Sequence, residues 1–271
     1  MNKQVLNIVQ DKSYSVQNPE ENLPMPSEKA KVKVWLVTGA SRGIGLEVAK
    51  RVIAAGERVA LLARGEAVLA VAQQLGDNAI GIQADVSDSA SVQTAIDKVL
   101  AKWGRIDTIV NNAGLHRGGK VGRLALEDWH AVLNTNLTGA LNVISAARSS
   151  LLEGSSIVNV GAVVGFRGFP GDVAYAASKA GLSGLTRALA IELAPKGICV
   201  NLVIPGLVLT DMTGALSDKA LESMRKTVPM GRYGEPQEIA EVIEWVARSR
   251  YMTGAFVPVD GGLMSSFGLP Q

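Results

Sequence analysis

The 271-residue chain is poor in cysteine, histidine and aromatic side chains. Cys199 is its one cysteine, so the chain forms no internal disulfide and no zinc site built on several cysteines. Its two histidines are too few for a metal centre made of several imidazoles. Because low cysteine content is typical of a reducing compartment, we expect a cytoplasmic protein that binds no metal.

The chain also lacks an excess of either charge and any long apolar run. Its 27 Lys+Arg against 25 Asp+Glu give a formal net charge of +2, without a basic patch or stripe. No run approaches the roughly 18 apolar residues of a transmembrane helix. Residues 1–26 lack the apolar core of a secretory signal. We therefore expect neither nucleic acid nor a membrane as a partner.

What the chain does have is a series of short Val/Ile/Leu-rich runs that alternate with helical spacing of apolar residues. Continuous apolar strands separated by helices predict a parallel sheet covered by helices on both faces. With right-handed connections this is a single-domain, doubly wound α/β fold of the Rossmann type. The predicted strands are residues 34–37, 58–63, 79–84, 107–111, 156–160, 198–204 and 255–259.

Two segments depart from this rhythm. Residues 1–31 contain three prolines and mixed charges without periodicity, and we expect a flexible N-terminal arm there. Residues 32–271 then form the cofactor-binding catalytic domain. The stretch at about 207–229 follows the carboxyl end of a strand, where ligands bind in such sheets, and this predicts a substrate lid.

A glycine-rich turn, Thr38-Gly39-Ala40-Ser41-Arg42-Gly43-Ile44-Gly45, follows the first predicted strand. Three glycines between a strand and a helix allow the backbone to approach a pyrophosphate at the helix N-terminus. The spacing is G-x-x-x-G-x-G rather than the commoner G-x-G-x-x-G. The candidate cofactor-binding residues in this turn are Gly39, Ser41, Arg42, Gly43, Ile44 and Gly45.

The tip of the second predicted strand indicates which nicotinamide cofactor binds. An NAD enzyme has a carboxylate there for the ribose 2′-hydroxyl, about 20 residues after the glycine motif. The chain has Leu62-Ala63-Arg64 instead. Arg64 and Arg42 are both placed to meet a 2′-phosphate, for which a guanidinium is well suited. NADP is therefore the predicted cofactor; the alternative is that both arginines are ordinary surface residues.

Tyr175 and Lys179 are four residues apart, so they share one face of a predicted helix. A phenol has a pKa of about 10, which is too high for easy proton exchange at neutral pH. An ammonium group one turn away favours the phenolate, and we expect it to lower the pKa of Tyr175. Tyr175 is thus a candidate general acid/base. Asn136 is predicted to sit early in a helix, about 20 residues after the motif Asn111-Asn112-Ala113-Gly114.

From about Lys33 to Gly262 the chain resembles the short-chain dehydrogenase/reductase family, and especially its 3-oxoacyl-carrier-protein reductases and carbonyl reductases. The combination of motifs is highly specific. In chain order the motifs are Thr38-Gly39-x-x-x-Gly43-x-Gly45, Asp85-Val86, Asn111-Asn112-Ala113-Gly114, Asn136, Tyr175-x-x-x-Lys179, Pro205-Gly206-x-x-x-Thr210 and Asp260-Gly261-Gly262.

The resemblance implies a role for each matching residue. Tyr175 would protonate the carbonyl oxygen during reduction, and Lys179 would lower its pKa and hold the nicotinamide ribose. Asn136 would position a water that links Lys179 to solvent. The resemblance also implies a homotetramer. Further cofactor contacts would come from Asp85, Val86, Asn112, Ala113, Gly114, Pro205, Gly206, Val208 and Thr210.

One position departs from the family pattern. The family carries a serine 13 residues before the tyrosine, and Ala162 stands at that place. The hydroxyl that would bond the substrate carbonyl is therefore absent, which indicates a disabled or weakly active form. Ala162, Val164 and Tyr175 are the candidate substrate-contacting residues. His116 and Arg117 follow the Asn motif and either recognise an acidic or polar substrate group or form an ordinary polar loop.

The sequence thus predicts an NADP-dependent oxidoreductase that interconverts a ketone and a secondary alcohol. Two other hypotheses stay open. One is a non-catalytic NADP-binding protein, for which Ala162 is the main argument. The other is a non-redox reaction at the same site, such as dehydration or epimerisation. The motifs fit many ketones and alcohols, so they do not identify the substrate.

Overall fold

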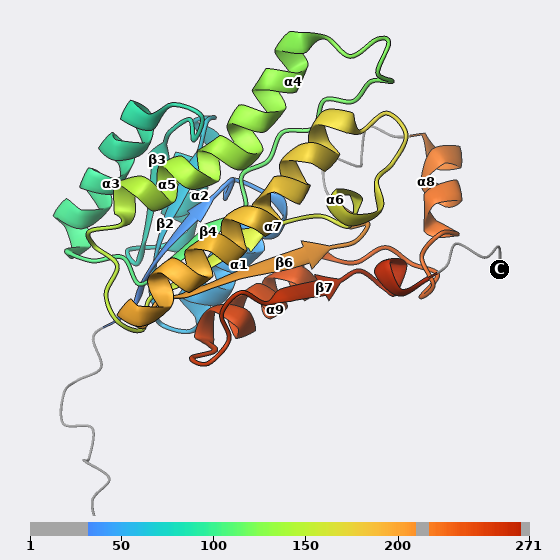
Figure 1. Cartoon of the computed structure of the whole chain (residues 1–271). Helices are drawn as coiled ribbons and strands as arrows, with labels where there is room; N and C mark the ends of the chain where they lie inside the picture. Colours follow the sequence, from blue (N-terminus) through green and yellow to red (C-terminus); the bar gives the residue numbers. More distant parts are fainter. Residues whose placement is uncertain (1–31, 210–216, 267–271) are drawn as a thin grey trace, which may run out of the picture. The chain divides into compact units, whose positions relative to one another are not determined.

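Figure 1 shows a computed structural model of the chain, which describes residues 32–209 and 217–266. Seven parallel strands form one sheet in the order β3-β2-β1-β4-β5-β6-β7. The predicted doubly wound sheet is confirmed, and each predicted strand is found to within one residue at either end. The strands are β1 (Val34–Thr38), β2 (Arg58–Ala63), β3 (Ala79–Gln83), β4 (Thr108–Asn111), β5 (Ser156–Val160), β6 (Cys199–Pro205) and β7 (Phe256–Val259).

Helices cover both faces of this sheet. One face is covered by α1 (Gly43–Ala54), α2 (Ala67–Leu75) and α9 (Pro236–Arg248). The other is covered by α3 (Ser89–Trp103), α5 (Gly139–Ala147) and α7 (Val173–Leu193). The shorter helical elements are α4 (Leu126–Leu133), η1 (Asn134–Thr138), α6 (Val164–Arg167), η2 (Ala194–Lys196), α8 (Asp218–Arg225) and η3 (Leu263–Ser265).

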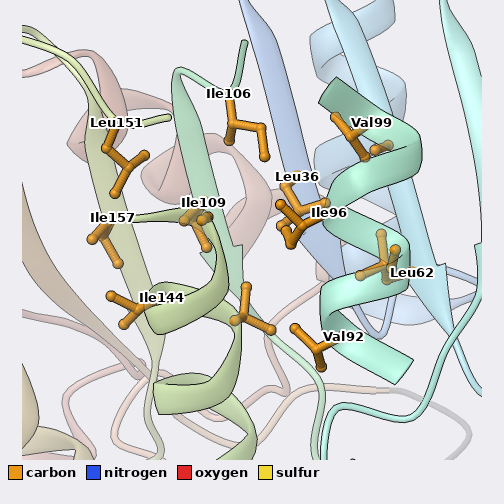
Figure 2. Close-up of a cluster of buried hydrophobic side chains, with 14 of the residues drawn as sticks. Leu36, Leu62, Val92, Ile96, Val99, Ile106, Ile109, Ile144, Leu151 and Ile157 are labelled. Atoms are coloured by element: carbon orange, nitrogen blue, oxygen red, sulfur yellow. The ribbon is translucent and has the colours of Figure 1, made fainter. Parts of the chain in front are cut away.

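The core consists of two apolar layers, one on each side of the sheet. Side chains alternate between the layers along each strand, because successive residues of a strand point to opposite faces. In Figure 2, Val92, Ile96 and Val99 of α3 lie opposite Leu36 and Leu62 of the sheet. In the central strands β1, β4 and β5 every residue is buried, which explains why their sequences are largely apolar rather than alternating.

The parallel arrangement brings the chemically distinctive segments to one edge of the sheet. The glycine-rich turn follows β1, the Asn motif begins at the end of β4, and Ala162 follows β5. Because all strands run in the same direction, their carboxyl ends share that edge. The strand order reverses between β1 and β4, and ligands bind at such a switch point.

The position of Asn136 differs from the prediction. It lies in the middle of a continuous helical run over residues 126–147, not early in a helix. The run contains a π-helical stretch, η1, between α4 and α5. Apolar periodicity does not reveal such an insertion, since the residues on either side keep helical spacing.

Two predicted segments reach outside the described residues. The N-terminal arm, residues 1–31, lies there entirely. The predicted lid at 207–229 lies there in part: residues 210–216 are outside, and α8 occupies much of the rest. Both assignments remain predictions.

Truncation of Leu36 tests the core between α3 and the sheet. Leu36 is fully buried, so Leu36→Ala should lower the free energy of unfolding by about 2–5 kcal/mol. Leu152→Ala serves as the control, because Leu152 is 60% exposed and its loss should change stability by no more than about 0.5 kcal/mol. Denaturant unfolding of both variants measures the difference. Similar losses in the two variants would contradict this description of the core.

Candidate active site

The glycine-rich turn after β1 requires glycine for two physical reasons. Gly39 and Gly43 have φ of +63° and +56°, in the left-handed region that disfavours side chains. A Cβ at Gly39 would lie 2.8 Å from Ala113 Cα, and one at Gly45 would lie 2.6 Å from Asn112 Nδ2. The turn therefore packs directly on the Asn motif that follows β4.

Hydrogen bonds between Thr38 and Asn112 tie the ends of β1 and β4 together. The Thr38 hydroxyl accepts from the backbone N–H groups of Asn112 at 3.0 Å and Ala113 at 2.9 Å. The Asn112 side chain donates to the carbonyls of Thr38 at 3.0 Å and Gly39 at 3.1 Å. We call this set of contacts the Thr38–Asn112 tie. The sequence motif contains Thr38 but did not reveal that this residue joins the ends of the two strands.

The start of α1 fits a bound pyrophosphate. In the described part of the chain, no side chain caps this helix start and its first turn holds no acidic residue. The first amides of a helix lack internal partners, and the helix dipole places partial positive charge there. An anion satisfies both, and the neighbouring glycines leave the backbone accessible to it.

Arg42 and Arg64 both lie at the carboxyl edge of the sheet. Arg42 is the N-cap residue of α1, and Arg64 directly follows β2; both are exposed. The backbone carbonyl of Arg64 accepts a hydrogen bond of 2.8 Å from Gln83, which ends β3. The tip of β2 thus presents a guanidinium where NAD enzymes have a carboxylate.

Asp85 and Val86 follow β3 at the same edge. The Asp85 carboxylate accepts from the backbone N–H of Ser87 at 2.9 Å and from its hydroxyl at 2.7 Å. The Val86 carbonyl accepts a hydrogen bond of 2.9 Å from Asn142 of α5. These contacts fix the backbone of the segment that was predicted to hold the adenine.

Tyr175 and Lys179 lie one turn apart on α7, as predicted. The Lys179 Nζ is 5.6 Å from the centroid of the Tyr175 ring and donates a 2.8 Å hydrogen bond to the carbonyl of Val160. Lys179 is only 3% exposed, and burial lowers its pKa to about 8. With this pKa the side chain is still largely an ammonium group at neutral pH, although burial has weakened its hold on the proton.

The expected lowering of the Tyr175 pKa is reversed in this structure. Burial of the phenol, and secondly the negative charge of Asp172, raise the pKa of Tyr175 to about 12. Burial disfavours the charged phenolate, and the pKa rises although Lys179 lies one turn away. At neutral pH the Tyr175 hydroxyl therefore keeps its proton, the state in which a tyrosine acts as an acid.

Asn136 connects three parts of the site. Its Oδ1 accepts from the backbone N–H of Leu115 at 2.7 Å, and its Nδ2 donates to the Leu115 carbonyl and to the Ser178 hydroxyl, both at 3.0 Å. Ser178 immediately precedes Lys179 on α7. Asn136 thus holds the segment after β4 against α7, while its predicted role in positioning a water stays a prediction.

Ala162 occupies the segment between β5 and α6, beside Lys179. Val160, two residues before Ala162, accepts the hydrogen bond from Lys179. Gly165 packs against the backbone of Lys179, because a Cβ on Gly165 would lie 2.9 Å from the Lys179 carbonyl carbon. Ala162 and Val164 are half-buried. Ser156 begins β5, at the opposite end of the strand, so it does not replace a hydroxyl at position 162.

The segment after β6 lines the same edge. The Pro205 carbonyl accepts a 3.0 Å hydrogen bond from the backbone N–H of Val163, and Gly206 packs against Asp260. Val208 is buried and pairs with Gly234 in an isolated bridge. Thr210, the remaining predicted cofactor contact, lies outside the described residues.

A pair that the sequence analysis missed stands next to Tyr175. His116 Nε2 lies 2.8 Å from Asp172 Oδ1, and the imidazole meets the Tyr175 ring edge-to-face with centroids 5.1 Å apart. The hydrogen bond to Asp172 raises the pKa of His116. Arg117 pairs instead with Asp128 of α4 at 2.7 Å. In the sequence, the one signal for this pair is that Asp172 precedes Tyr175 by three residues.

Neither a metal centre nor a membrane-spanning helix is found in the described part of the chain. Within residues 32–209 and 217–266, no three His, Cys, Asp or Glu side chains are grouped as metal ligands. No helix in those ranges combines the length and apolarity needed to cross a membrane. The arrangement at the carboxyl edge of the sheet is therefore the chemically richest site that the structure describes.

Known proteins are similar to this chain over most of its length. A family model described as enoyl-(acyl carrier protein) reductase matches residues 39–264. Carbonyl reductase family member 4 of Danio rerio is 44% identical over 234 residues, which cover 85% of this chain and 98% of that protein. A 3-oxoacyl-(acyl-carrier-protein) reductase of Homo sapiens is 42% identical over 234 residues, with the same two coverages of 85% and 98%.

A solved structure is similar as well. It is the crystal structure of a blue fluorescent protein from a metagenomic library in complex with NADPH. It superposes on this chain with a TM-score of 0.81 at 36% identity, covering 85% of this chain and 97% of that one.

Proposed function

The chain belongs to the short-chain dehydrogenase/reductase family of oxidoreductases, and we propose that it uses NADP(H) to interconvert a ketone and a secondary alcohol. The observation that carries the proposal is the placement of Tyr175 one turn from the buried Lys179 on α7, with Nζ 5.6 Å from the ring centroid, at the same sheet edge as an uncapped helix start. Family membership also leads us to propose a cytoplasmic homotetramer.

The cofactor is NADP, which supplies or accepts the hydride when it is bound. The turn at residues 39–45 would hold the pyrophosphate, and Arg42 and Arg64 would hold the 2′-phosphate. The residues after β3 would contact the adenine, and Lys179 the nicotinamide ribose. The chain's own task is then to bind and orient the substrate carbonyl and to manage one proton.

Tyr175 supplies that proton during reduction. Hydride addition to the carbonyl carbon places negative charge on the oxygen, and the Tyr175 hydroxyl donates its proton there to complete the alcohol. The phenolate that remains is stabilised by the Lys179 ammonium, whose field is strong in a buried site. Solvent then reprotonates Tyr175. Because burial raises the pKa of Tyr175 to about 12, its hydroxyl carries the proton at neutral pH and is available to the reacting oxygen.

Ala162 weakens this chemistry without removing it. One hydrogen-bond donor to the reacting oxygen is missing, whereas Tyr175, Lys179 and Asn136 are all present. A protein that only binds NADP has no use for a proton donor, so we place the catalytic function ahead of the non-catalytic one. A non-redox reaction would leave NADPH unconsumed. The names of the relatives make 3-oxoacyl thioesters and simple ketones the first substrates to test.

Replacement of Arg64 tests the choice of cofactor. A lost charge-assisted contact costs about 1.5–3 kcal/mol, so Arg64→Ala should raise the Kd for NADPH by roughly 10- to 150-fold and leave that for NADH unchanged. Arg148→Ala, at an exposed arginine after α5, is the matched control. Calorimetric titration measures both constants. Equal affinity of the parent protein for the two cofactors would overturn the assignment.

Replacement of Tyr175 tests the proton donor. Tyr175→Phe should bind NADPH with an unchanged Kd but show no ketone-dependent loss of NADPH absorbance, because the ring remains and the proton does not. Tyr251→Phe removes a hydroxyl from a fully exposed tyrosine and should keep full activity. Undiminished turnover in Tyr175→Phe would show that another group protonates the product.

Restoration of a hydroxyl at Ala162 tests the departure from the family pattern. Loss of one donor to a developing oxyanion typically costs a factor of about 10²–10³ in rate, so Ala162→Ser should raise kcat at least about tenfold. Ala177→Ser, at an exposed alanine of α7, should change nothing. The Tm of Ala162→Ser should stay close to that of the parent. If Ala162→Ser gains no rate with a ketone that the parent binds, the binding or non-redox hypothesis moves ahead.

A further inference from the structure

The pair of His116 and Asp172 lies beside the Tyr175 ring and has no part in the mechanism described so far. His116 comes from the segment after β4, and Asp172 immediately precedes α7. The centroid of the imidazole lies 5.1 Å from the centroid of the Tyr175 ring, and Lys179 Nζ lies 5.6 Å from that same ring centroid. The proton donor is therefore flanked by two side chains that can carry positive charge.

The backbone around the pair is held at several points. Asn136 bonds both the N–H and the carbonyl of Leu115, the residue before His116. The N–H of Gly119 donates a 2.7 Å hydrogen bond to the carbonyl of Gly171, the residue before Asp172. The imidazole and the carboxylate are thus presented to each other by two segments that are tied together. Such support is what a preorganised catalytic group requires.

The hydrogen bonding of His116 leaves one ring nitrogen available. Asp172 engages Nε2, and in the described residues no hydrogen-bond partner faces Nδ1. The side chain is 37% exposed, so a small molecule can reach it. A neutral imidazole that donates from Nε2 to Asp172 has only a lone pair on Nδ1, whereas the protonated imidazole carries a second N–H there.

We propose that His116 is a further catalytic residue: oriented by Asp172, its protonated imidazole donates a hydrogen bond from Nδ1 to the substrate oxygen that Tyr175 protonates. It thereby supplies the second donor that Ala162 lacks. The inference rests on the proposed ketone reduction. The overall balance is unchanged, because the carbon receives the hydride and the oxygen receives the Tyr175 proton. His116 keeps its proton and only stabilises the negative charge as it develops.

The charges around His116 predict a pH dependence. Asp172 and Tyr175 face the imidazole from α7 and the residue before it, and its neighbour Arg117 is paired with Asp128 of α4. The hydrogen bond to Asp172 raises the pKa of His116, so the imidazole keeps the Nδ1–H donor to higher pH than an ordinary histidine would. Turnover should fall as pH rises through this pKa. Asp172→Asn should move the fall to lower pH, and Asp128→Asn should not.

A double-mutant cycle with Ala162 tests the proposal. His116→Phe keeps an aromatic ring against Tyr175 but removes the donor, and it should lower kcat at least about tenfold in the Ala162 protein. In the Ala162→Ser protein, where a hydroxyl already serves the oxygen, the same change should lower kcat less than about threefold. His130→Phe, at the chain's other histidine, on the exposed surface of α4, is the control.

Two measurements separate catalysis from structure. The Kd for NADPH should be the same in His116→Phe and the parent. The ¹³C–¹H signals of His116 should titrate at lower pH in Asp172→Asn than in Asp128→Asn.

An equal loss of kcat in both Ala162 and Ala162→Ser backgrounds, or no loss in either, would overturn the role of His116. If Ala162→Ser reduces ketones and Tyr175→Phe abolishes this, the proposed function stands independently of that result. If no form consumes NADPH, both proposals fail.

Discussion

The Thr38–Asn112 tie is the interaction on which the rest of the site depends. It joins the ends of β1 and β4 at the point where the strand order reverses. On one side it holds the glycine-rich turn, in which Gly39 and Gly45 approach the Asn motif too closely for a side chain. On the other it starts the segment that Asn136 fastens to α7. The glycine-rich turn and the segment that leads to the Tyr175–Lys179 pair are therefore joined at a single junction, which connects the two halves of the proposed site.

Burial governs the chemistry at that junction. Lys179 is an ammonium group taken out of water, and Tyr175 is a phenol with its proton held on. Each side chain in isolation would be poorly suited to proton transfer at neutral pH. In the proposed mechanism Tyr175 is the proton donor, and the charge of Lys179 stabilises the phenolate that remains. Asp172 adds to the retention of the Tyr175 proton and also holds His116, so one carboxylate acts on both neighbours.

Sequence reasoning predicted the fold and the place of the glycine-rich turn between β1 and α1, because both depend on local patterns. Continuous apolar runs identified the strands, and the glycine spacing identified the turn. It misplaced Asn136, because periodicity cannot show a π-helical insertion, and it missed the His116–Asp172 pair, whose members are 56 residues apart. The sequence also led to the wrong sign for the shift of the Tyr175 pKa. The nearby Lys179 predicted a lowered pKa, whereas the burial that raises it depends on elements distant in sequence.

The most direct test of the central claim is to follow the hydride itself. Ala162→Ser protein would be incubated with NADPH carrying deuterium at the transferable position and with a 3-oxoacyl thioester or a simple ketone, and the product analysed by mass spectrometry. The account predicts an alcohol in which one deuterium is bound to the former carbonyl carbon, with one NADPH consumed per product. Recovery of converted substrate without deuterium, alongside intact labelled NADPH, would contradict it.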